Sequence, residues 1–290
     1  MIGLDDLSSG RIANLAEARS YGQQFTFHTI DIRSDGLRAL FERHRPDVVM
    51  HLGAQTSVRR SVEDPRRDAE VNLVGLLNVL ESAAVTGVRK VVFASSGGTI
   101  YGEQRKLPVK ETARRGSRPD SPYGVSKKAA EDYLSYFRRS RGVDYTALAL
   151  ANVYGPRQDP HGEAGVVSIF GGLMIEGEAP TIFGDGTQTR DYVFVEDTVH
   201  AFALSVDQGS GMLLNVGTGT ESSVNDIYRL LARITGHGGK PLFGPPRGGE
   251  VRRSALDIQL AAKELGWAPW TKLAEGLKAT VEYLRSRRPG

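Results

Sequence analysis

The chain has 290 residues, of which 40% are hydrophobic and 24% are charged, with a net charge of +3 and no cysteine. This size and composition indicate a globular protein built as one large domain or as a domain with a smaller lobe, and the lack of cysteine excludes disulfides, thiolate metal ligands and a cysteine nucleophile. The basic residues are spread along the chain rather than gathered into a stripe, which argues against a nucleic-acid partner, and no stretch is long and apolar enough to cross a bilayer.

Strand-length apolar runs alternate with helix-length amphipathic stretches through the first half of the chain. The first ten residues carry no basic segment, so they do not read as a signal peptide, and residues 2–4 are expected to end a short strand. In chain order we then expect a helix at 11–19, a strand at 25–32, a helix at 35–43, a strand at 48–52, a helix at 68–86, a strand at 91–94, a helix at 122–139 and an extended segment at 145–153. This alternation predicts an α/β fold with a doubly wound parallel sheet, in which ligands bind at the carboxyl ends of the strands.

The character of the chain changes after residue 155. Residues 156–161 and 183–189 are rich in Gly, Pro, Asp and Gln, which is typical of loops, and the tail ends in two predicted helices. We therefore expect a first domain at 1–155, to which the chain returns at about 191–220, and a smaller α/β lobe formed mainly by 156–290.

The central chemical signal is the segment Ser-Pro-Tyr-Gly-Val-Ser-Lys at 121–127. Tyr123 and Lys127 are four residues apart near the start of a predicted helix, so both side chains project from one face. A neighbouring ammonium stabilises a phenolate and lowers its pKa, which lets a tyrosine accept the proton of a sugar hydroxyl while hydride leaves the same carbon. Alone, such a pair is more often an ordinary surface pair, so its meaning depends on the motifs around it.

Those motifs follow one another at regular spacing. In chain order they occupy residues 5–10, 51–55, 95–102, 121–127, 151–157, 184–186, 190–192 and 247–250. On them the chain resembles the extended short-chain dehydrogenase/reductase family, of the NAD-dependent epimerase/dehydratase type and in particular the UDP-glucose 4-epimerase-like group. The resemblance implies a Rossmann-like fold, NAD as cofactor for the domain at 1–155, and a substrate-binding role for the smaller lobe.

The resemblance assigns cofactor contacts to the ends of the predicted strands. Asp5 would bind the adenosine ribose, where a carboxylate suits NAD because it repels the extra phosphate of NADP. Lys127 would hold a ribose hydroxyl, and Asn72 would order the strand-end loops, although a simple buried amide is an alternative. The complete set of expected cofactor residues is Asp5, Asp31, Ile32, Leu52, Gly53, Ala54, Gln55, Asn72, Ser95, Tyr123 and Lys127.

The resemblance also implies catalysis by Tyr123 and Lys127 with the help of a serine or threonine. The chain carries one residue more between Phe93 and Tyr101 than the family pattern, so the alignment leaves three candidates, Ser95, Ser96 and Thr99. We prefer Ser96 as the third catalytic residue. The uridine diphosphate and sugar would be held by Thr99, Asn152, Arg190, Arg247 and Glu250, since arginines neutralise a diphosphate and an acid accepts from a ribose hydroxyl.

The implied activity is NAD-dependent 4-epimerisation of a UDP-sugar through a transient 4-keto intermediate. Related dehydratases and decarboxylases carry acidic residues before the motif tyrosine, where this chain has Gly98-Thr99-Ile100. The alternatives are another nucleotide-sugar dehydratase, decarboxylase or reductase of the family, or a truncated non-catalytic binding protein. We further expect a cytoplasmic location and a homodimer formed through the helices at 68–86 and 122–139.

One family element is not found. Members begin with a strand and a Gly-x-x-Gly-x-x-Gly loop that delivers backbone N–H groups to the cofactor pyrophosphate, and no such loop precedes Asp5. We therefore expect the central first strand to be missing from the sheet and the strands on either side of it to lose their shared neighbour. A start codon assigned too late, a fragment, or an unknown compensation would each explain this, and the chain is expected to bind NAD weakly.

Overall fold

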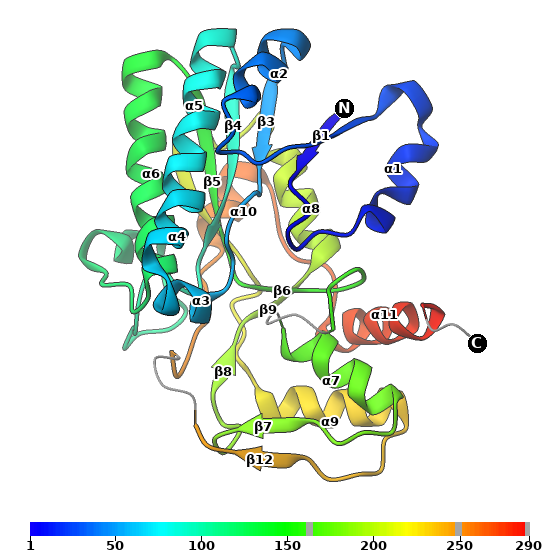
Figure 1. Cartoon of the computed structure of the whole chain (residues 1–290). Helices are drawn as coiled ribbons and strands as arrows, with labels where there is room; N and C mark the ends of the chain where they lie inside the picture. Colours follow the sequence, from blue (N-terminus) through cyan, green and yellow to red (C-terminus); the bar gives the residue numbers. More distant parts are fainter. Residues whose placement is uncertain (161–164, 247–250, 288–290) are drawn as a thin grey trace.

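A computed structural model of the chain describes residues 1–160, 165–246 and 251–287. Its upper lobe is built on a four-stranded parallel sheet, in the order β10 (Met212–Val216), β5 (Asp144–Leu150), β4 (Lys90–Ser96) and β3 (Val48–His51) (Figure 1). The register places Val91 opposite both Val49 and Tyr145. The strands are nearly continuous apolar runs because helices cover both faces.

Alternate residues of β4 pack into the two hydrophobic cores on opposite faces of the sheet. Val91 and Phe93 pack with α2 (Gly36–His44), α5 (Gly75–Thr86) and α6 (Pro122–Arg141), whereas Val92 packs with α8 (Val195–Leu204) and α10 (Gln259–Leu265). Successive side chains of a strand point to opposite faces, which is why one strand contributes to two cores. The result is the doubly wound arrangement predicted from the sequence.

The strands at the start of the chain form a separate sheet. β1 (Ile2–Asp5) pairs in parallel with β2 (Thr26–Thr29), with Ile2 opposite Thr26. Within the described residues β1 is hydrogen-bonded to β2 and not to β3, so the sheet of the upper lobe is in two parts. This agrees with the expectation that the strands on either side of the family's first strand lack a shared neighbour. Between β1 and β2 run η1 (Ile12–Leu15), α1 (Ala16–Ser20) and η2 (Gly22–Gln24).

The helix expected at 68–86 is interrupted. The chain forms α3 (Val58–Glu63), α4 (Pro65–Ala69), a π-helical turn η3 (Glu70–Val74) and then α5. The predicted start was three residues late because the side chain of Asp64 caps α4 by accepting from the N–H of Arg67 and Pro65 occupies the first helical position. The wide turn contains Asn72, and such turns often occur at functional sites.

Helix α6, which carries Tyr123 and Lys127, has well-defined ends. Ser121 caps its first turn by accepting from the N–H of Gly124 over 3.2 Å, and Pro122 follows at the first helical position. Gly142 ends it in the left-handed conformation, with φ of 72°. The helix is longer than predicted at its carboxyl end, and its first turn lies at the carboxyl end of β4.

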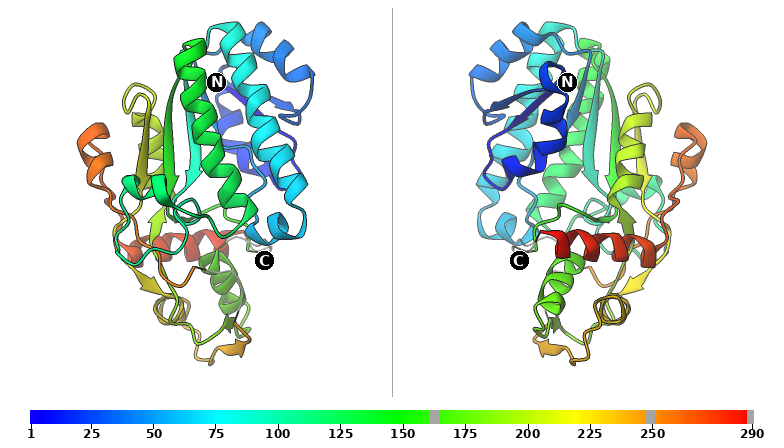
Figure 2. Two further views of the ribbon diagram at one scale, coloured as in Figure 1. Left: turned by 90° about the vertical axis from the view of Figure 1, so that its left-hand side faces the viewer. Right: turned by 90° about the vertical axis from the view of Figure 1, so that its right-hand side faces the viewer.

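The lower lobe has its own core. Helices α7 (Val166–Ile175), α9 (Val224–Thr235) and α11 (Leu273–Ser286) pack around Phe170, Ile182 and Leu231. Its short strand pairs are β6 (Asn152–Tyr154) with β9 (Tyr192–Phe194), β7 (Thr181–Phe183) with β12 (Leu242–Gly244), and β8 (Thr189–Arg190) with β11 (Ser222–Ser223). Both views of Figure 2 show α11 lying across the molecule between the upper lobe and α7.

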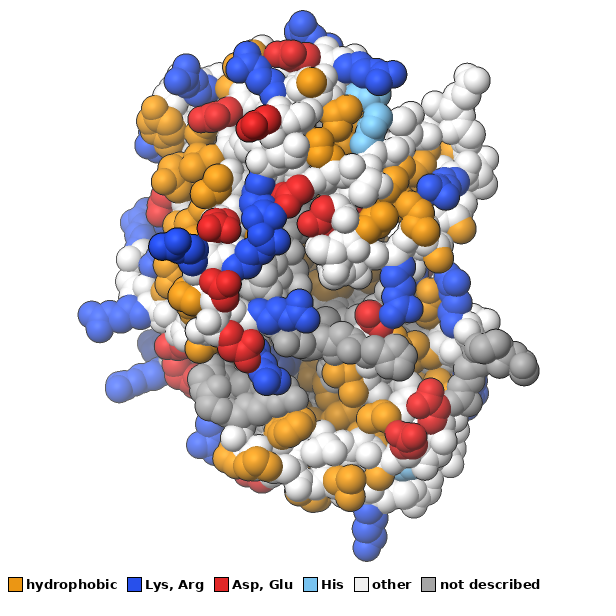
Figure 3. Space-filling view, in the orientation of Figure 1, with side chains coloured by type: hydrophobic (Ala, Val, Ile, Leu, Met, Phe, Trp, Pro, Cys, Tyr) orange, Lys and Arg blue, Asp and Glu red, His pale blue; other side chains and the backbone are white. Residues whose placement is uncertain are grey.

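Hydrophobic side chains gather on the flank of the upper lobe where α5 and α6 run (Figure 3). They form two stripes at helical spacing, one with Val74 and Val85, which are 54% and 56% exposed, and one with Val125, Tyr133 and Tyr136 on α6. No described helix combines the length and apolarity that a membrane span requires.

Candidate active site

Tyr123 and Lys127 lie together on the buried face of α6. Tyr123 is 9% exposed and Lys127 is 3% exposed. The ammonium of Lys127 donates to the carbonyl of Ala94 over 2.8 Å and lies 5.8 Å from the centre of the Tyr123 ring. It also lies 4.7 Å from the centre of the Phe93 ring. The pair thus projects from one helix face toward the carboxyl end of β4, as the spacing of the two residues predicts.

The protonation of this pair corrects one expectation. Burial raises the pKa of Tyr123 to about 12, and the side-chain hydrogen bond with Ser96 only partly offsets this rise. The expected lowering by Lys127 is not found, because the ammonium is directed at the carbonyl of Ala94. Burial also lowers the pKa of Lys127 to about 8. The phenol is therefore neutral at pH 7 in the chain alone, and it becomes a base only where added positive charge stabilises the phenolate.

The structure separates the three candidates for the assisting hydroxyl. Ser96 lies near enough to Tyr123 for its hydroxyl to lower the pKa of the phenol. Ser95 instead donates to the buried carboxylate of Glu131 over 2.7 Å, and Thr99 makes a long bond of 3.4 Å to the carbonyl of Ser96. Of the three, Ser96 is the one whose side chain acts on the pKa of the phenol, while Ser95 and Thr99 have partners elsewhere, which favours Ser96 as the residue that assists Tyr123.

The loop after β3 is held by Asn72 from the π-helical turn. The side-chain oxygen of Asn72 accepts from the N–H of Gln55 over 2.8 Å, and its amide donates to the carbonyl of Gln55 over 3.0 Å. Asn72 is 3% exposed. The two bonds replace the strand pairing that Gln55 lacks, so Asn72 fixes the strand-end loop as expected.

The strand ends that should meet the adenosine carry suitable groups. Asp5 ends β1, and its carboxylate accepts from the N–H of Leu7 over 2.7 Å. Asp31 follows β2 and is paired with Arg33, whose hydrogen bond lowers the pKa of that carboxyl. Ile32 lies beside Gly53, where a Cβ would make ordinary van der Waals contact with the Ile32 side chain at 3.7 Å.

These groups fit the two ends of a dinucleotide. A carboxylate at Asp5 can accept from ribose hydroxyls, Ile32 offers an apolar surface for a base, and the exposed Leu52 with Gly53 and Ala54 leaves room for the ligand backbone. At the other end, Lys127 and Tyr123 can hold the second ribose. The residues present therefore suit NAD at its adenosine and nicotinamide ends.

The residues expected to bind the substrate are only partly brought together. Asn152 is exposed at the start of β6, and its side-chain oxygen lies 3.9 Å from the position of a Cβ on Gly98, close to the loop after β4. Arg190 lies on β8 and donates to the carbonyl of Thr189. Arg247 and Glu250 lie outside the described residues.

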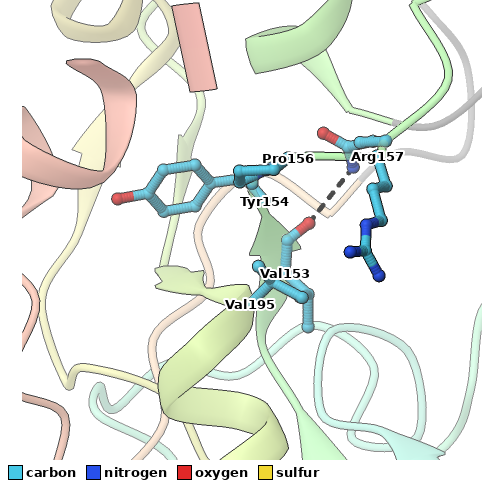
Figure 4. Close-up of a pocket in the computed structure, with 7 residues that line it drawn as sticks. Val153, Tyr154, Pro156, Arg157 and Val195 are labelled. Carbon is cyan, nitrogen blue, oxygen red and sulfur yellow. Dashed lines mark hydrogen bonds between the residues drawn. The ribbon is translucent and has the colours of Figure 1, made fainter. Parts of the chain in front are cut away.

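A pocket of about 330 Å³ lies where β6 leaves the upper lobe (Figure 4). Tyr154, Pro156, Arg157 and Val195 line it, and the side chains of Tyr154 and Arg157 extend in opposite directions. Gly155 is required here because a Cβ would lie 2.5 Å from a methyl of Val195. The pocket lies where the chain passes between the two lobes, and Tyr123 is not among the residues that line it.

Sequence reasoning missed two buried acids. Asp68 and Glu131 are 0% and 4% exposed, and both hydrogen-bond to residues of the site. The spacing of these acids could have identified them, because Asp68 lies one helical turn before Asn72 and Glu131 lies one turn after Lys127. Acids at such positions on the apolar face of a predicted helix need buried partners.

Comparison with known proteins gives consistent results. Residues 1–217 match the model of the family described as the NAD dependent epimerase/dehydratase family. The chain is 47% identical over 288 residues to UDP-glucose 4-epimerase of Mycolicibacterium smegmatis, covering 99% of this chain and 91% of that protein.

Solved structures are also similar. A crystal structure of UDP-glucose 4-epimerase with UDP-glucose from Thermotoga maritima superposes with a TM-score of 0.94 at 47% identity, covering 98% of this chain and 90% of that one. The Thermus thermophilus UDP-glucose 4-epimerase complex with NAD gives a TM-score of 0.89 at 40% identity, covering 99% and 91%.

Proposed function

The chain belongs to the NAD dependent epimerase/dehydratase family, and on that premise we propose that it is an enzyme that interconverts the C4 epimers of a UDP-sugar, UDP-glucose and UDP-galactose. The similarity to UDP-glucose 4-epimerases extends over nearly the whole chain. The observation that carries the proposal is the meeting of Tyr123, Ser96 and Lys127 at the carboxyl end of β4.

The residues of the chain supply the proton chemistry. Tyr123 takes the proton from the C4 hydroxyl, Ser96 holds the oxygen of that hydroxyl by hydrogen bonding, and Lys127 provides positive charge beside the phenol. Loss of this proton together with the hydride on C4 gives a 4-keto intermediate. The intermediate turns in the site, so that hydride returns to the opposite face of C4 while Tyr123 gives the proton back to the C4 oxygen. No net oxidation occurs, because the same groups act in both directions.

The cofactor of the reaction is NAD, which when bound accepts the hydride from C4 and returns it. We propose that residues 1–155 hold it, with Asp5 on the adenosine ribose, Ile32 beside the adenine and Lys127 on the nicotinamide ribose. The lobe formed mainly by 156–290 would hold the uridine diphosphate through Arg190 and Asn152, together with Arg247 and Glu250. Forked arginine donors suit a diphosphate. The chain has no cysteine and so needs no disulfide, which suits the reducing cytoplasm, and we propose that location for it.

The proposal is tested by the substitution Tyr123→Phe. It removes the hydroxyl that exchanges the proton while it preserves the buried ring. We expect conversion of UDP-galactose to UDP-glucose, measured with NAD present, to fall by about 10²–10⁴-fold with little change in thermal stability. An active wild type with an equally active Tyr123→Phe variant would contradict the role of Tyr123, and an inactive wild type would contradict the function itself.

We propose in addition that two copies pair through the apolar flank of α5 and α6 (Figure 3). Exposed apolar stripes on two adjacent helices, including Val74, Tyr133 and Tyr136, suit burial against the same helices of a second copy. The double substitution Tyr133→Glu and Tyr136→Glu should convert the protein to a monomer in light scattering. Val199→Glu, at a residue that is 60% exposed on α8, should leave the mass unchanged. A wild-type monomer, or a double variant that stays a dimer, would contradict the proposal.

A further inference from the structure

A buried carboxylate joins the catalytic helix to the loop after β3. Asp68 on α4 is 0% exposed. One of its oxygens accepts from the amides of Gln55 and Asn72 over 2.9 Å and 3.0 Å. The other accepts from the hydroxyl of Ser126 over 2.6 Å. One carboxylate therefore ties together the strand-end loop, the π-helical turn and the first turns of α6.

The position of Ser126 gives this contact its significance. Ser126 lies between Tyr123 and Lys127 in the chain and is 3% exposed. A hydrogen bond from its hydroxyl fixes the rotation of α6 about its axis, because the neighbouring side chains turn with the same backbone. The contact thus controls where the phenol and the ammonium point.

The charge of Asp68 also acts on the pair. Its field raises the pKa of Lys127, against the burial that lowers it to about 8, and it raises the pKa of Tyr123 as well. The other titratable group facing Lys127 is His51 from β3, whose pKa burial lowers to about 3, so that His51 is neutral and adds no charge. The partners Gln55, Asn72 and Ser126 are uncharged. The buried Glu131, one turn further along α6, is paired with Arg114. Among the described residues, Asp68 is thus the carboxylate whose charge acts on the pKa of Lys127.

Hydrogen bonding alone does not explain a carboxylate here. An asparagine at position 68 could accept from both amides with its oxygen and donate to the hydroxyl of Ser126 with its nitrogen. It would do so without the desolvation cost of a buried charge. A charged residue at this place therefore suits an electrostatic task in addition to an anchoring one.

We propose that Asp68 is a positioning residue for the epimerase reaction: it anchors α6 through Ser126 and places a buried negative charge that keeps Lys127 protonated. This rests on the function proposed above for Tyr123 and Lys127. A protonated Lys127 is needed because a neutral amine cannot stabilise the phenolate that forms when Tyr123 takes the substrate proton.

The test is the isosteric substitution Asp68→Asn. The first readout is the titration of Lys127 in the protein without added cofactor, followed by NMR of labelled lysine side chains and assigned with Lys127→Arg. We expect the Lys127 pKa to fall by roughly half a unit to one unit in Asp68→Asn. In the epimerase assay, the decline of kcat at alkaline pH should move to lower pH by the same amount, with the KM for the UDP-sugar unchanged.

The matched control is Asp197→Asn on α8. Asp197 is also 0% exposed and accepts from the N–H of Thr271 over 3.2 Å, in contact with the tail rather than with the catalytic helix. This variant should lose stability but leave the Lys127 titration and the pH profile in place. Equal titration of Lys127 in wild type and Asp68→Asn would overturn the electrostatic role of Asp68.

A second variant keeps the proposal testable where Asp68→Asn does not fold. Ser126→Ala removes the shortest bond to the carboxylate and leaves its charge. We expect a kcat reduced several-fold with an unchanged KM, and an unchanged kcat would overturn the anchoring role. A titration shift in Asp68→Asn without any epimerase activity in the wild type would leave the role of Asp68 standing and contradict the proposed function.

Discussion

Burial is the largest influence on the pKa values of Tyr123 and Lys127. The pKa of Tyr123 is raised to about 12 and that of Lys127 is lowered to about 8, so both groups are driven toward their neutral forms. From the sequence we expected the opposite change for Tyr123, because residue spacing shows which side chains are neighbours and not how deeply they are buried. Ser96 was preferred over Ser95 and Thr99 from the sequence, although the additional residue between Phe93 and Tyr101 leaves the alignment open. The structure supports this preference, because Ser95 and Thr99 have other partners and Ser96 acts on the phenol.

The buried charge of Lys127 should lower stability. Its folded-state pKa of about 8 lies below the ordinary lysine pKa of 10.5, so the unfolded chain binds the proton more tightly. The cost is fully present below pH 8 and disappears as the pH rises toward 10.5. We predict that Lys127→Met, which removes the charge but also the donor to the carbonyl of Ala94, is more stable than the wild type at pH 7 by roughly 1–2 kcal/mol, and is inactive.

Urea unfolding at pH 7 and at pH 10 checks this prediction. The advantage of Lys127→Met should shrink between the two pH values, because the wild-type ammonium loses its proton over that range. Equal stability of the two proteins at pH 7, or an advantage that does not change with pH, would show that Lys127 carries no desolvation cost.

At the scale of elements, the periodicity of the sequence predicts most strands and helices to within a few residues. It fails between residues 58 and 86, where one predicted helix is three joined segments preceded by the unpredicted α3. The caps at Ser57 and Asp64 explain the extra starts. The wide turn around Asn72 depends on long-range bonds to Gln55, which no local pattern contains.

The loop that contains η4 (Glu111–Gly116) is held to α6 by a buried ion pair. The guanidinium of Arg114 bonds to Glu131, and Glu131 accepts from Ser95 as well, with side-chain exposures of 21% for Arg114 and 5% for Glu131. We predict that Arg114→Gln, which leaves the buried carboxylate of Glu131 without its cation, destabilises the protein by roughly 2–3 kcal/mol in chemical denaturation.

An exposed ion pair gives the control for Arg114→Gln. Arg59 and Glu63 form an i,i+4 pair with side chains that are 79% and 60% exposed. Arg59→Gln should leave the denaturation midpoint unchanged, because water screens such pairs. Similar losses in both variants would mean that the Arg114–Glu131 pair is no more important to the fold than a surface contact.

At the scale of the whole molecule, two lobes with separate cores meet at the carboxyl ends of β4 and β6 (Figure 1). The doubly wound class was predicted from the strand–helix alternation, and the splitting of the sheet between β1 and β3 was predicted from the missing glycine loop. The substrate-binding residues of the lower lobe could be predicted from the sequence only as a set of candidates, without their arrangement around Tyr123. Arg190 and Asn152 are distant in sequence from Tyr123, and Arg247 and Glu250 lie outside the described residues.

The central claim is that a hydride leaves C4 of the sugar and returns to the same carbon while Tyr123 exchanges the proton. The most direct test uses UDP-galactose with deuterium at C4, incubated with the protein and NAD in ordinary water, with the product examined by NMR. We predict UDP-glucose that retains deuterium at C4, and no product from Tyr123→Phe. Product in which the C4 deuterium has been replaced by solvent hydrogen would contradict the account.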